Sequence, residues 1–413
     1  MAAPDRGNES NTGTPSRRQL IFGGAAAAGA GAVAALGIEH VFPMRQAAPE
    51  PVPLNGDETV PFYGVHQAGI DTDAPAHTTF IGLDLRPETD RDGLRRLMRL
   101  LTDDAARLTQ GEPPLADSEP ELSVAPARLT VTFGFGPGFV ERSAKSGPKW
   151  LRPLPTFEID RLQPEFCDGD LMIQIGSDDP LTVAHASRML LKDARSFATV
   201  RWTQAGFRRA HGTVKPGTTM RNLFGQVDGT SNPVPGSADF DEVVWSTGGW
   251  MSGGTSAVIR RIKMDLDKWD RLDRSGRDQA IGRFQSNGAP ITSTPHGAEA
   301  EFDEPDFEAK NSFGFPVIPE ISHLARARPV KKHERIFRRA YNYQLPSAGE
   351  ELSDSGLIFV SYQADVDRQF TPIQKRLDEL DLLNEWTTPI GSAVFAIPPG
   401  CSEGGYIGET LLA

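Results

Sequence analysis

The chain has 413 residues, of which 38% are hydrophobic and 24% charged, a composition typical of a soluble globular protein with one large domain or two ordinary ones. It carries 43 basic against 55 acidic residues, a formal charge of −12, which disfavours nucleic acid and anionic lipid as partners because both require a basic face. Two cysteines, Cys167 and Cys401, exclude a disulfide framework and a four-thiolate metal site. Whether these two pair with each other stays open.

The first 60 residues predict export. A basic pair, Arg17 and Arg18, precedes an apolar stretch of alanine and glycine that runs to about residue 38, which is typical of a twin-arginine signal peptide over residues 1–44. A transmembrane anchor is the alternative, but alanine and glycine insert weakly into a bilayer. Residues 45–60 are rich in proline and alanine and read as a linker. We therefore expect a periplasmic, cell-surface or extracellular protein with no permanent membrane span after cleavage.

The next part of the chain alternates predicted strands and helices. The apolar patterning predicts these elements in order: a strand at 79–85, an amphipathic helix at 92–110, strands at 129–135 and 170–176, a helix at 180–194 and a strand within 195–210. This strand–helix–strand–strand–helix–strand order is that of a ferredoxin-like domain, which we place at residues 61–235.

The second half repeats this order. We predict a strand at 254–264, a helix at 266–281, strands at 335–343 and 356–364, a helix at 371–383 and a last strand at 393–398. These form a second ferredoxin-like domain over residues 236–413, so the fold class is α+β with antiparallel sheets flanked by helices. Residues 284–322 lack periodicity and predict a long loop, and loops of that length tend to be functional.

Asp228 is the first candidate for chemistry. It lies in the run Gly225-Gln226-Val227-Asp228-Gly229-Thr230, between glycines that allow a sharp turn and a close approach to a flat ligand. An acid held in such a turn can face a pocket, although Asp-Gly is also the commonest signal of a hairpin turn. The motif alone favours the hairpin turn, so a role for Asp228 in a pocket depends on the other candidate residues of the chain.

His323 and the pair Arg338-Arg339 are the other candidates. His323 follows the long loop and precedes a basic cluster; its imidazole could bind a metal through one nitrogen while the other donates to a carboxylate, or it could be an ordinary surface histidine. On a strand, alternation points Arg338 and Arg339 to opposite faces, so one of them can enter a given pocket. No histidine pair has zinc-helix spacing and no nucleophile elbow occurs, so neither a zinc enzyme nor a hydrolase is supported.

These residues converge on a family. Residues 60–413 resemble the dye-decolorising peroxidases, haem peroxidases with a double ferredoxin-like fold. The resemblance rests on the order and spacing of the following elements: Phe62–Ile70, Phe133–Pro137, Gly169–Leu171 with Gln174 and Asp178–Pro180, Gly225–Thr230, Gly253–Thr255 with Arg260–Ile262, His323, and Arg338–Tyr343. The signal and the Tyr63–Ile70 element are similar to the exported branch that contains deferrochelatase-like peroxidases. The chain departs from the family pattern at Ala340, where glycine is usual, and at Asp168.

The resemblance implies a site for haem b, one per chain, bound mainly by the C-terminal half. It implies Asp228 as the distal acid/base, Arg338 as the distal arginine and His323 as the axial iron ligand. It also implies cofactor contacts at Gly229, Thr230, Ser231, Arg328, Pro329 and Val330. A carboxylate should hold the second nitrogen of His323, and the long loop supplies these candidates: Glu299, Glu301, Asp303, Glu304, Asp306, Glu308 and Glu320.

The implied function is a peroxidase that reduces hydrogen peroxide and oxidises dyes, phenolics or other bulky organic donors. An aspartate has an ordinary pKa near ~4, so a distal aspartate predicts an acidic activity optimum. A narrow haem pocket would make bulky donors react at the surface through aromatic relays, with Trp245, Trp250, Trp269, Tyr341, Tyr343 and Tyr362 as candidates. Two alternatives stay open: a deferrochelatase that releases iron from intact porphyrin, and a haem carrier without activity. The sequence does not settle whether the chain forms a homo-oligomer.

Overall fold

The computed structural model describes residues 54–294, 298–347 and 349–413. The predicted signal peptide at 1–44 and most of the predicted linker at 45–60 lie outside the described residues. Within those ranges, no helix is both long and apolar enough to span a bilayer.

The first half forms an antiparallel sheet with two long helices. Its elements in chain order are β1 (His77–Leu85), α1 (Arg91–Thr109), β2 (Thr130–Phe135), α2 (Pro137–Arg142), β3 (Leu171–Ser177), α3 (Pro180–Ala194) and β4 (Ala198–Phe207). The strand order is β2-β3-β1-β4. Asp90 and Asp179 begin α1 and α3 by accepting hydrogen bonds from backbone N–H groups of the first turn. This order confirms the predicted ferredoxin-like fold for this half.

The second half repeats the arrangement with shorter helices. Its elements are α4 (Ala238–Val244), β5 (Thr255–Met264), α5 (Leu266–Trp269), α6 (Arg274–Ile281), α7 (His323–Ala327), β6 (Phe337–Arg338), β7 (Tyr341–Leu345), β8 (Asp354–Gln363), α8 (Phe370–Leu380), β9 (Thr387–Ile397) and α9 (Glu409–Leu412). The sheet order is β9-β5-β8-β7, with β6 also paired to β8. Short 3-10 turns η1 to η6 occupy Asn55–Asp57, Pro120–Leu122, Pro164–Phe166, Gly249–Met251, Ala298–Phe302 and Leu382–Glu385.

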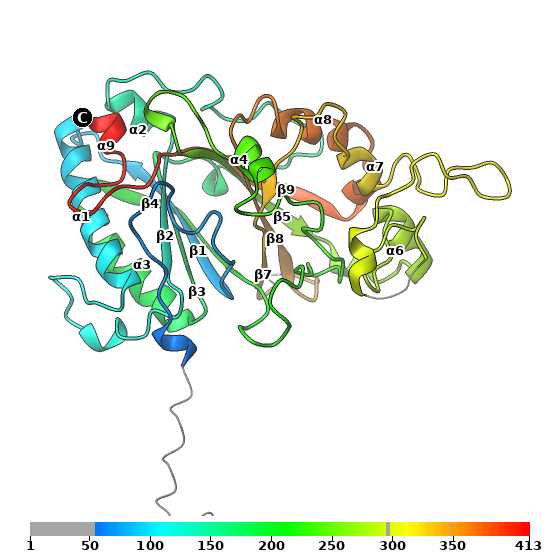
Figure 1. The fold of residues 1–413 in the computed structure, drawn as a ribbon, viewed down its shortest axis with the longest axis horizontal. Coiled ribbons are helices and arrows are strands. Elements are labelled where there is room, and N and C mark those ends of the chain that lie inside the picture. Colours follow the sequence, from blue (N-terminus) through cyan, green and yellow to red (C-terminus); the bar gives the residue numbers. More distant parts are fainter. Residues whose placement is uncertain (1–53, 295–297, 348) are drawn as a thin grey trace, which may run out of the picture. The chain divides into compact units, whose positions relative to one another are not determined.

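The two sheets meet at both edges and enclose a shared core. Phe135 of β2 pairs with Ala396 of β9, and Phe207 of β4 pairs with Asn342 of β7. The facing sides contribute large apolar residues to one cluster, among them Phe80, Met172, Trp202, Ile259, Tyr362 and Phe395. On its other side the first sheet is covered by α1 and α3 (Figure 1), whose leucines join the core cluster beneath them. Burial of this kind is the main stabilising contribution to a fold.

The structure differs from the predicted elements at three places. The predicted helix at 266–281 is two helices, because Asp273 accepts a hydrogen bond from Gly276 N and begins a new one. The predicted strand at 335–343 breaks at Arg339-Ala340 into β6 and β7. The last strand begins at Thr387 rather than at residue 393, since its first residues pair with the end of β5.

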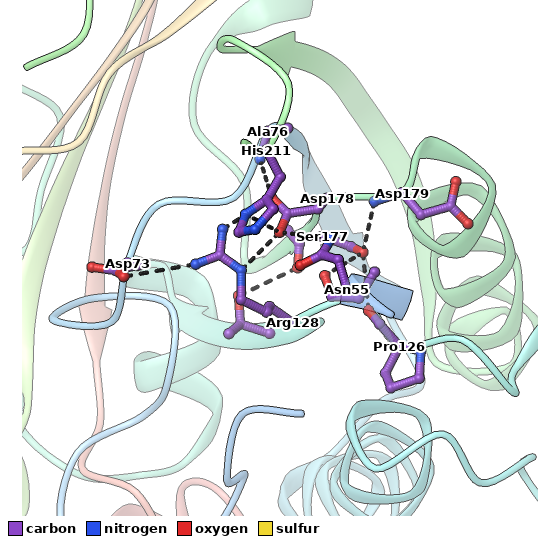
Figure 2. A network of polar contacts seen from close by, with 12 residues as sticks. Asn55, Asp73, Ala76, Pro126, Arg128, Ser177, Asp178, Asp179 and His211 are labelled. Carbon is purple, nitrogen blue, oxygen red and sulfur yellow. Dashed lines mark hydrogen bonds and ion pairs between the residues drawn. The ribbon is translucent and has the colours of Figure 1, made fainter. Parts of the chain in front are cut away.

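A buried carboxylate, Asp178, ties four segments of the first half together (Figure 2). It accepts hydrogen bonds from Arg128 Nε at 2.7 Å, from Ala76 N at 2.9 Å and from Asn55 Nδ2 at 3.4 Å, and His211 Nδ1 lies 3.3 Å away. Burial alone would raise the pKa of Asp178, but the Arg128 guanidinium and the N–H donors outweigh it and lower the pKa. The anionic carboxylate is therefore the form that holds these segments together.

A second acidic pair lies between α1 and α3. Asp104 on α1 is buried, and its side chain hydrogen-bonds to Asp193 on α3. Burial and this contact raise the pKa of Asp193 to about 8, and burial also raises the pKa of Asp104. One proton is therefore shared between the two carboxyl groups at neutral pH.

Candidate active site

A cavity of about 450 Å³ lies against the side of the second sheet that faces away from the shared core. Along β5, alternation directs Arg260, Ile262 and Met264 into the cavity, while Ile259 packs into the shared core. The opposite lining comes from α7 and α8. The volume is in the range of small-molecule and cofactor sites. The two halves thus differ: α1 and α3 pack directly on the first sheet, whereas a cavity separates the second sheet from α7 and α8.

Asp228 lines this cavity at the end of a hairpin arm. The turn of the hairpin is at Asn222–Gln226, where Gly225 N donates to Asn222 O and Asn222 N donates to Gln226 O. Asp228 N donates to Met220 O at 2.8 Å on the other arm. Gly225 has a φ of 78° and Gly229 a φ of 129°, which L side chains rarely adopt. Asp228-Gly229 is thus not the hairpin turn itself but the point at which the chain leaves the hairpin.

Arg338 of β6 lies beside Asp228. Its Nη1 is 3.3 Å from Asp228 Oδ1, and its Nη2 is 3.4 Å from Ser231 Oγ. Asn232 fixes the backbone of Arg338, because Arg338 N donates to Asn232 Oδ1 at 3.0 Å and Asn232 Nδ2 donates to Arg338 O at 2.7 Å. The chain that follows Asp228 is therefore bonded to the strand that carries Arg338.

Arg339 points away from the cavity, as the alternation along this segment predicted. Its side chain is 3% exposed, and it donates to the carbonyls of Ile70, Thr72 and Asp73 in the first half of the chain. The two arginines are therefore not a pair of exposed charges on an edge strand. Ala340 packs in a core cluster with Phe224 and Trp269 rather than at the cavity wall.

His323 is the first residue of α7 and also lines the cavity. Its Nδ1 lies 2.6 Å from Oδ2 of Asp381, a carboxylate that is 3% exposed. Burial alone would lower the pKa of His323, but the Asp381 carboxylate outweighs it and the pKa is raised. When Nδ1 donates to Asp381, Nε2 is left as a ligand for a metal.

The carboxylate that contacts His323 is Asp381, which is not among the candidates predicted in the long loop. It follows α8, 58 residues beyond His323. Its other oxygen accepts from Leu383 N and begins the 3-10 turn at Leu382–Glu385. The sequence around Asp381 carries no pattern that marks it as the partner of a histidine. Of the loop candidates, Glu301 instead lies at the hairpin, where it accepts from Thr219 and Thr230.

The other predicted cofactor contacts divide into two groups. Gly229, Thr230, Ser231 and Pro329 line the cavity. Arg328 and Val330 are not part of this lining: the Arg328 guanidinium lies 4.6 Å from the ring centre of Phe307, and Val330 is 68% exposed.

Unpaired polar groups show what kind of ligand the cavity fits. The half-buried Arg283 guanidinium donates through Nη1 to the carbonyls of Gly288 and Glu301, and among the described residues no carboxylate lies within ion-pair distance of it. Burial and the nearby Arg338 lower its pKa. Gln226 is 3% exposed and its Nε2 has no hydrogen-bond partner in the described part of the chain.

A half-buried guanidinium with no carboxylate at ion-pair distance and a buried amide donor without an acceptor favour a ligand that carries acidic groups. Much of the remaining lining is apolar, including Phe224, Leu357, Phe359, Phe370 and Leu377. A large apolar ring system with acidic substituents meets both requirements, and haem is such a group. The residues present therefore fit the cofactor that the sequence resemblance implied.

The aromatic candidates for electron relay are mostly buried. Trp269, Tyr341, Tyr343 and Tyr362 are at most 2% exposed. Trp269 stacks on the cavity residue Phe224 with ring centres 4.4 Å apart. A relay role for any of them stays a prediction. Cys167 and Cys401, both in the described part of the chain, form no disulfide.

Two joined ferredoxin-like sheets, with these histidine–aspartate and arginine–aspartate pairs in one cavity, fit a haem-dependent oxidoreductase. The model "Dyp-type peroxidase, N-terminal" matches residues 67–208, and "Dyp-type peroxidase, C-terminal" matches residues 219–402, which include Asp228, His323 and Arg338. The chain belongs to the Dyp-type peroxidase family, and the peroxidase function predicted from its sequence is confirmed.

Individual relatives agree with this assignment. A dye-decolorizing peroxidase of Thermobifida fusca is 36% identical over 84% of this chain and 83% of its own length. A deferrochelatase of Escherichia coli is 34% identical over 98% of this chain and 99% of its own length. The crystal structure of a DyP-type peroxidase from Cellulomonas bogoriensis is 51% identical and superposes with a TM-score of 0.83, covering 87% of this chain and 99% of that one.

Proposed function

We propose that this chain holds one haem b in the cavity through His323 and activates hydrogen peroxide with Asp228 and Arg338. An organic donor then supplies the electrons. The observation that carries the proposal is that all three side chains line one cavity, with His323 backed by Asp381 and Asp228 in contact with Arg338. The Arg283 guanidinium, which has no carboxylate at ion-pair distance among the described residues, and the Gln226 amide, which lacks an acceptor there, would serve the polar edge of the cofactor.

Haem, when bound, supplies an iron that takes up the oxidising equivalents of peroxide and passes them on one electron at a time. The Asp228 carboxylate takes the proton from one peroxide oxygen and returns it to the leaving oxygen. The Arg338 guanidinium stabilises the negative charge on that leaving oxygen without losing its own proton. Asp381 keeps His323 oriented and its Nε2 available. Because the base is an aspartate, we expect an acidic activity optimum.

Visible spectra of the purified protein, before and after one equivalent of peroxide, test cofactor and reaction together. His323→Ala should abolish the Soret band, and full retention of haem would contradict the axial role. Asp228→Asn and Arg338→Leu should keep the Soret band but slow the first spectral change after mixing with peroxide by at least tenfold. Asp241→Asn, an exposed carboxylate on α4, is the matched control. Parent-like rates in both cavity variants would remove their proposed roles.

A deferrochelatase activity is the second candidate, and the near full-length match to the Escherichia coli relative favours it. Release of iron with the porphyrin intact would appear as protoporphyrin fluorescence after incubation with haem. A haem carrier is disfavoured by the Asp228–Arg338 pair, because a carrier would need no acid–base group in its cavity. An unchanged spectrum after peroxide would favour the carrier.

We also propose export by the twin-arginine route to the periplasm, cell surface or exterior, supported by Arg17-Arg18 and the apolar stretch that follows. Replacing both arginines by lysine should retain the full-length precursor inside the cell. Normal export of that variant would contradict the proposed route.

A further inference from the structure

Glu301 connects the long loop to the hairpin that carries Asp228. It lies in the 3-10 turn Ala298–Phe302, 71 and 82 residues from its two partners. Its Oε1 accepts a hydrogen bond from Thr219 Oγ1 at 3.2 Å, and its Oε2 accepts one from Thr230 Oγ1 at 3.1 Å. Each oxygen of one carboxylate thus binds a different hydroxyl.

The two threonines stand at the open end of the hairpin. Thr219 precedes the first arm, and Thr230 follows the second arm just after Asp228 and Gly229. The last backbone hydrogen bond between the arms is Asp228 N to Met220 O at 2.8 Å. Beyond this bond, the Glu301 carboxylate connects the two ends of the hairpin through its hydrogen bonds with Thr219 and Thr230.

Glu301 is itself held in place. Arg283 Nη1 donates to Glu301 O at 2.8 Å and to Gly288 O at 2.7 Å. Arg283 is a half-buried cavity residue that also feels the charge of Arg338. The backbone from which the Glu301 carboxylate extends is therefore bonded to a residue of the cavity wall.

We propose that Glu301 is a positioning residue for Asp228, acting through Thr219 and Thr230 on the distance between Asp228 and Arg338. The proposal rests on the proposed function, in which Asp228 moves the peroxide proton. Glu301 does not contact Asp228 or Arg338 in the described structure, so it takes no part in proton transfer. A displacement of about 1 Å at a reacting group can cost about 100-fold in rate, and the salt contact of 3.3 Å between Asp228 and Arg338 leaves little room for movement.

Glu301→Ala and Glu301→Gln test the proposal on the haem-loaded protein. Glu301→Ala should slow the first spectral change with peroxide by about 10- to 100-fold while the affinity for haem stays within about twofold of the parent. Glu301→Gln should restore most of the rate, because an amide can accept from one threonine and donate to the hydroxyl oxygen of the other. Asp303→Ala is the matched control, since Asp303 is an exposed acid on the same loop.

Fluoride affinity of the ferric protein is a second readout, and it does not depend on turnover. It reports on Arg338, because a hydrogen-bond donor in the cavity stabilises the bound anion. It should fall in Glu301→Ala and recover in Glu301→Gln. A parent-like peroxide rate and fluoride affinity in Glu301→Ala would overturn the proposal. So would a slow Glu301→Gln variant, which would require the charge itself rather than the hydrogen bonds.

If Glu301→Ala fails to fold, the double variant Thr219→Val/Thr230→Val decides, because it removes both hydroxyls and keeps the carboxylate. Slow peroxide reaction with normal haem content supports the positioning role of Glu301, and a parent-like rate overturns it. Failure of the proposed function would appear differently, as a parent protein whose spectrum does not respond to peroxide.

Discussion

Asp381→Asn tests the best-defined contact of the cavity. The substitution keeps the shape of the side chain but removes the negative charge that lies 2.6 Å from His323 Nδ1. The carboxylate is 3% exposed, so solvent screens it little. A hydrogen bond to a charged group contributes about 1.5–3 kcal/mol, and 1.4 kcal/mol is about tenfold in an equilibrium constant. We therefore expect haem affinity to fall by about 10- to 100-fold, as is usual when the partner of a metal-bound histidine is lost.

The assay is titration of the cofactor-free protein with haem, followed by the Soret band, together with the ferric/ferrous reduction potential. A less basic imidazole stabilises ferric iron less, so the potential of Asp381→Asn should be higher than that of the parent. Asp378→Asn is the matched control: Asp378 is on α8, three residues before Asp381, and its carboxylate accepts from Ile159 N at 2.9 Å rather than from His323. Unchanged affinity and potential in Asp381→Asn would refute the assignment of Asp381 as the partner that tunes the axial histidine.

Two further predictions concern stability. Asp160→Ala leaves the buried Arg260 guanidinium without its carboxylate, so unfolding free energy should fall by about 3–5 kcal/mol, and the double variant Asp160→Leu/Arg260→Met should recover part of it; equal denaturation midpoints in the single variant and parent would contradict this. The pKa of Asp193 is raised to about 8 in the fold, so the folded chain keeps a proton that the unfolded chain releases above about pH 4. The stability that the Asp104–Asp193 pair contributes is therefore complete below about pH 4 and is lost as the pH rises toward 8. Asp193→Asn should therefore stabilise the protein increasingly from pH 5 to 8, by about 2 kcal/mol at the upper end after allowance for partial exposure, and a melting-temperature difference from the parent that is constant over this range would contradict the shared proton with Asp104.

The fold was predictable because its strands and helices are strongly periodic and recur in the same order. The leucine spacing in α1 and the apolar run of β3 leave little ambiguity. The break between α5 and α6 was missed because apolar spacing continues through it, and what ends the first helix is a cap at Asp273. Likewise, β6 and β7 read as one strand because Arg338 and Arg339 do alternate, although the pairing is interrupted between them.

The site was predictable where the residues themselves are distinctive and not where distant segments meet. Asp228 between glycines, His323 and Arg338 were identified, and the structure brings all three to one cavity. Asp381, Arg283 and Asn232 carry no such local signal. Each acts through a contact that forms only on folding. His323 and Asp381, for example, are 58 residues apart in the chain, and a single sequence does not show that they meet.

The cavity against the second sheet makes cofactor loading a part of folding. In the first half, α1 and α3 fill the side of their sheet with leucines and close a complete core. In the second half, the same side of the sheet faces a cavity of about 450 Å³, bordered by the half-buried Arg283, which among the described residues has no carboxylate at ion-pair distance. Under the proposed function haem would occupy this cavity, and the free energy of haem binding would then add to the free energy of folding of the second half. If the chain is exported in its folded state, as proposed, loss of haem would then lower the amount exported by lowering the fraction of chain that is folded.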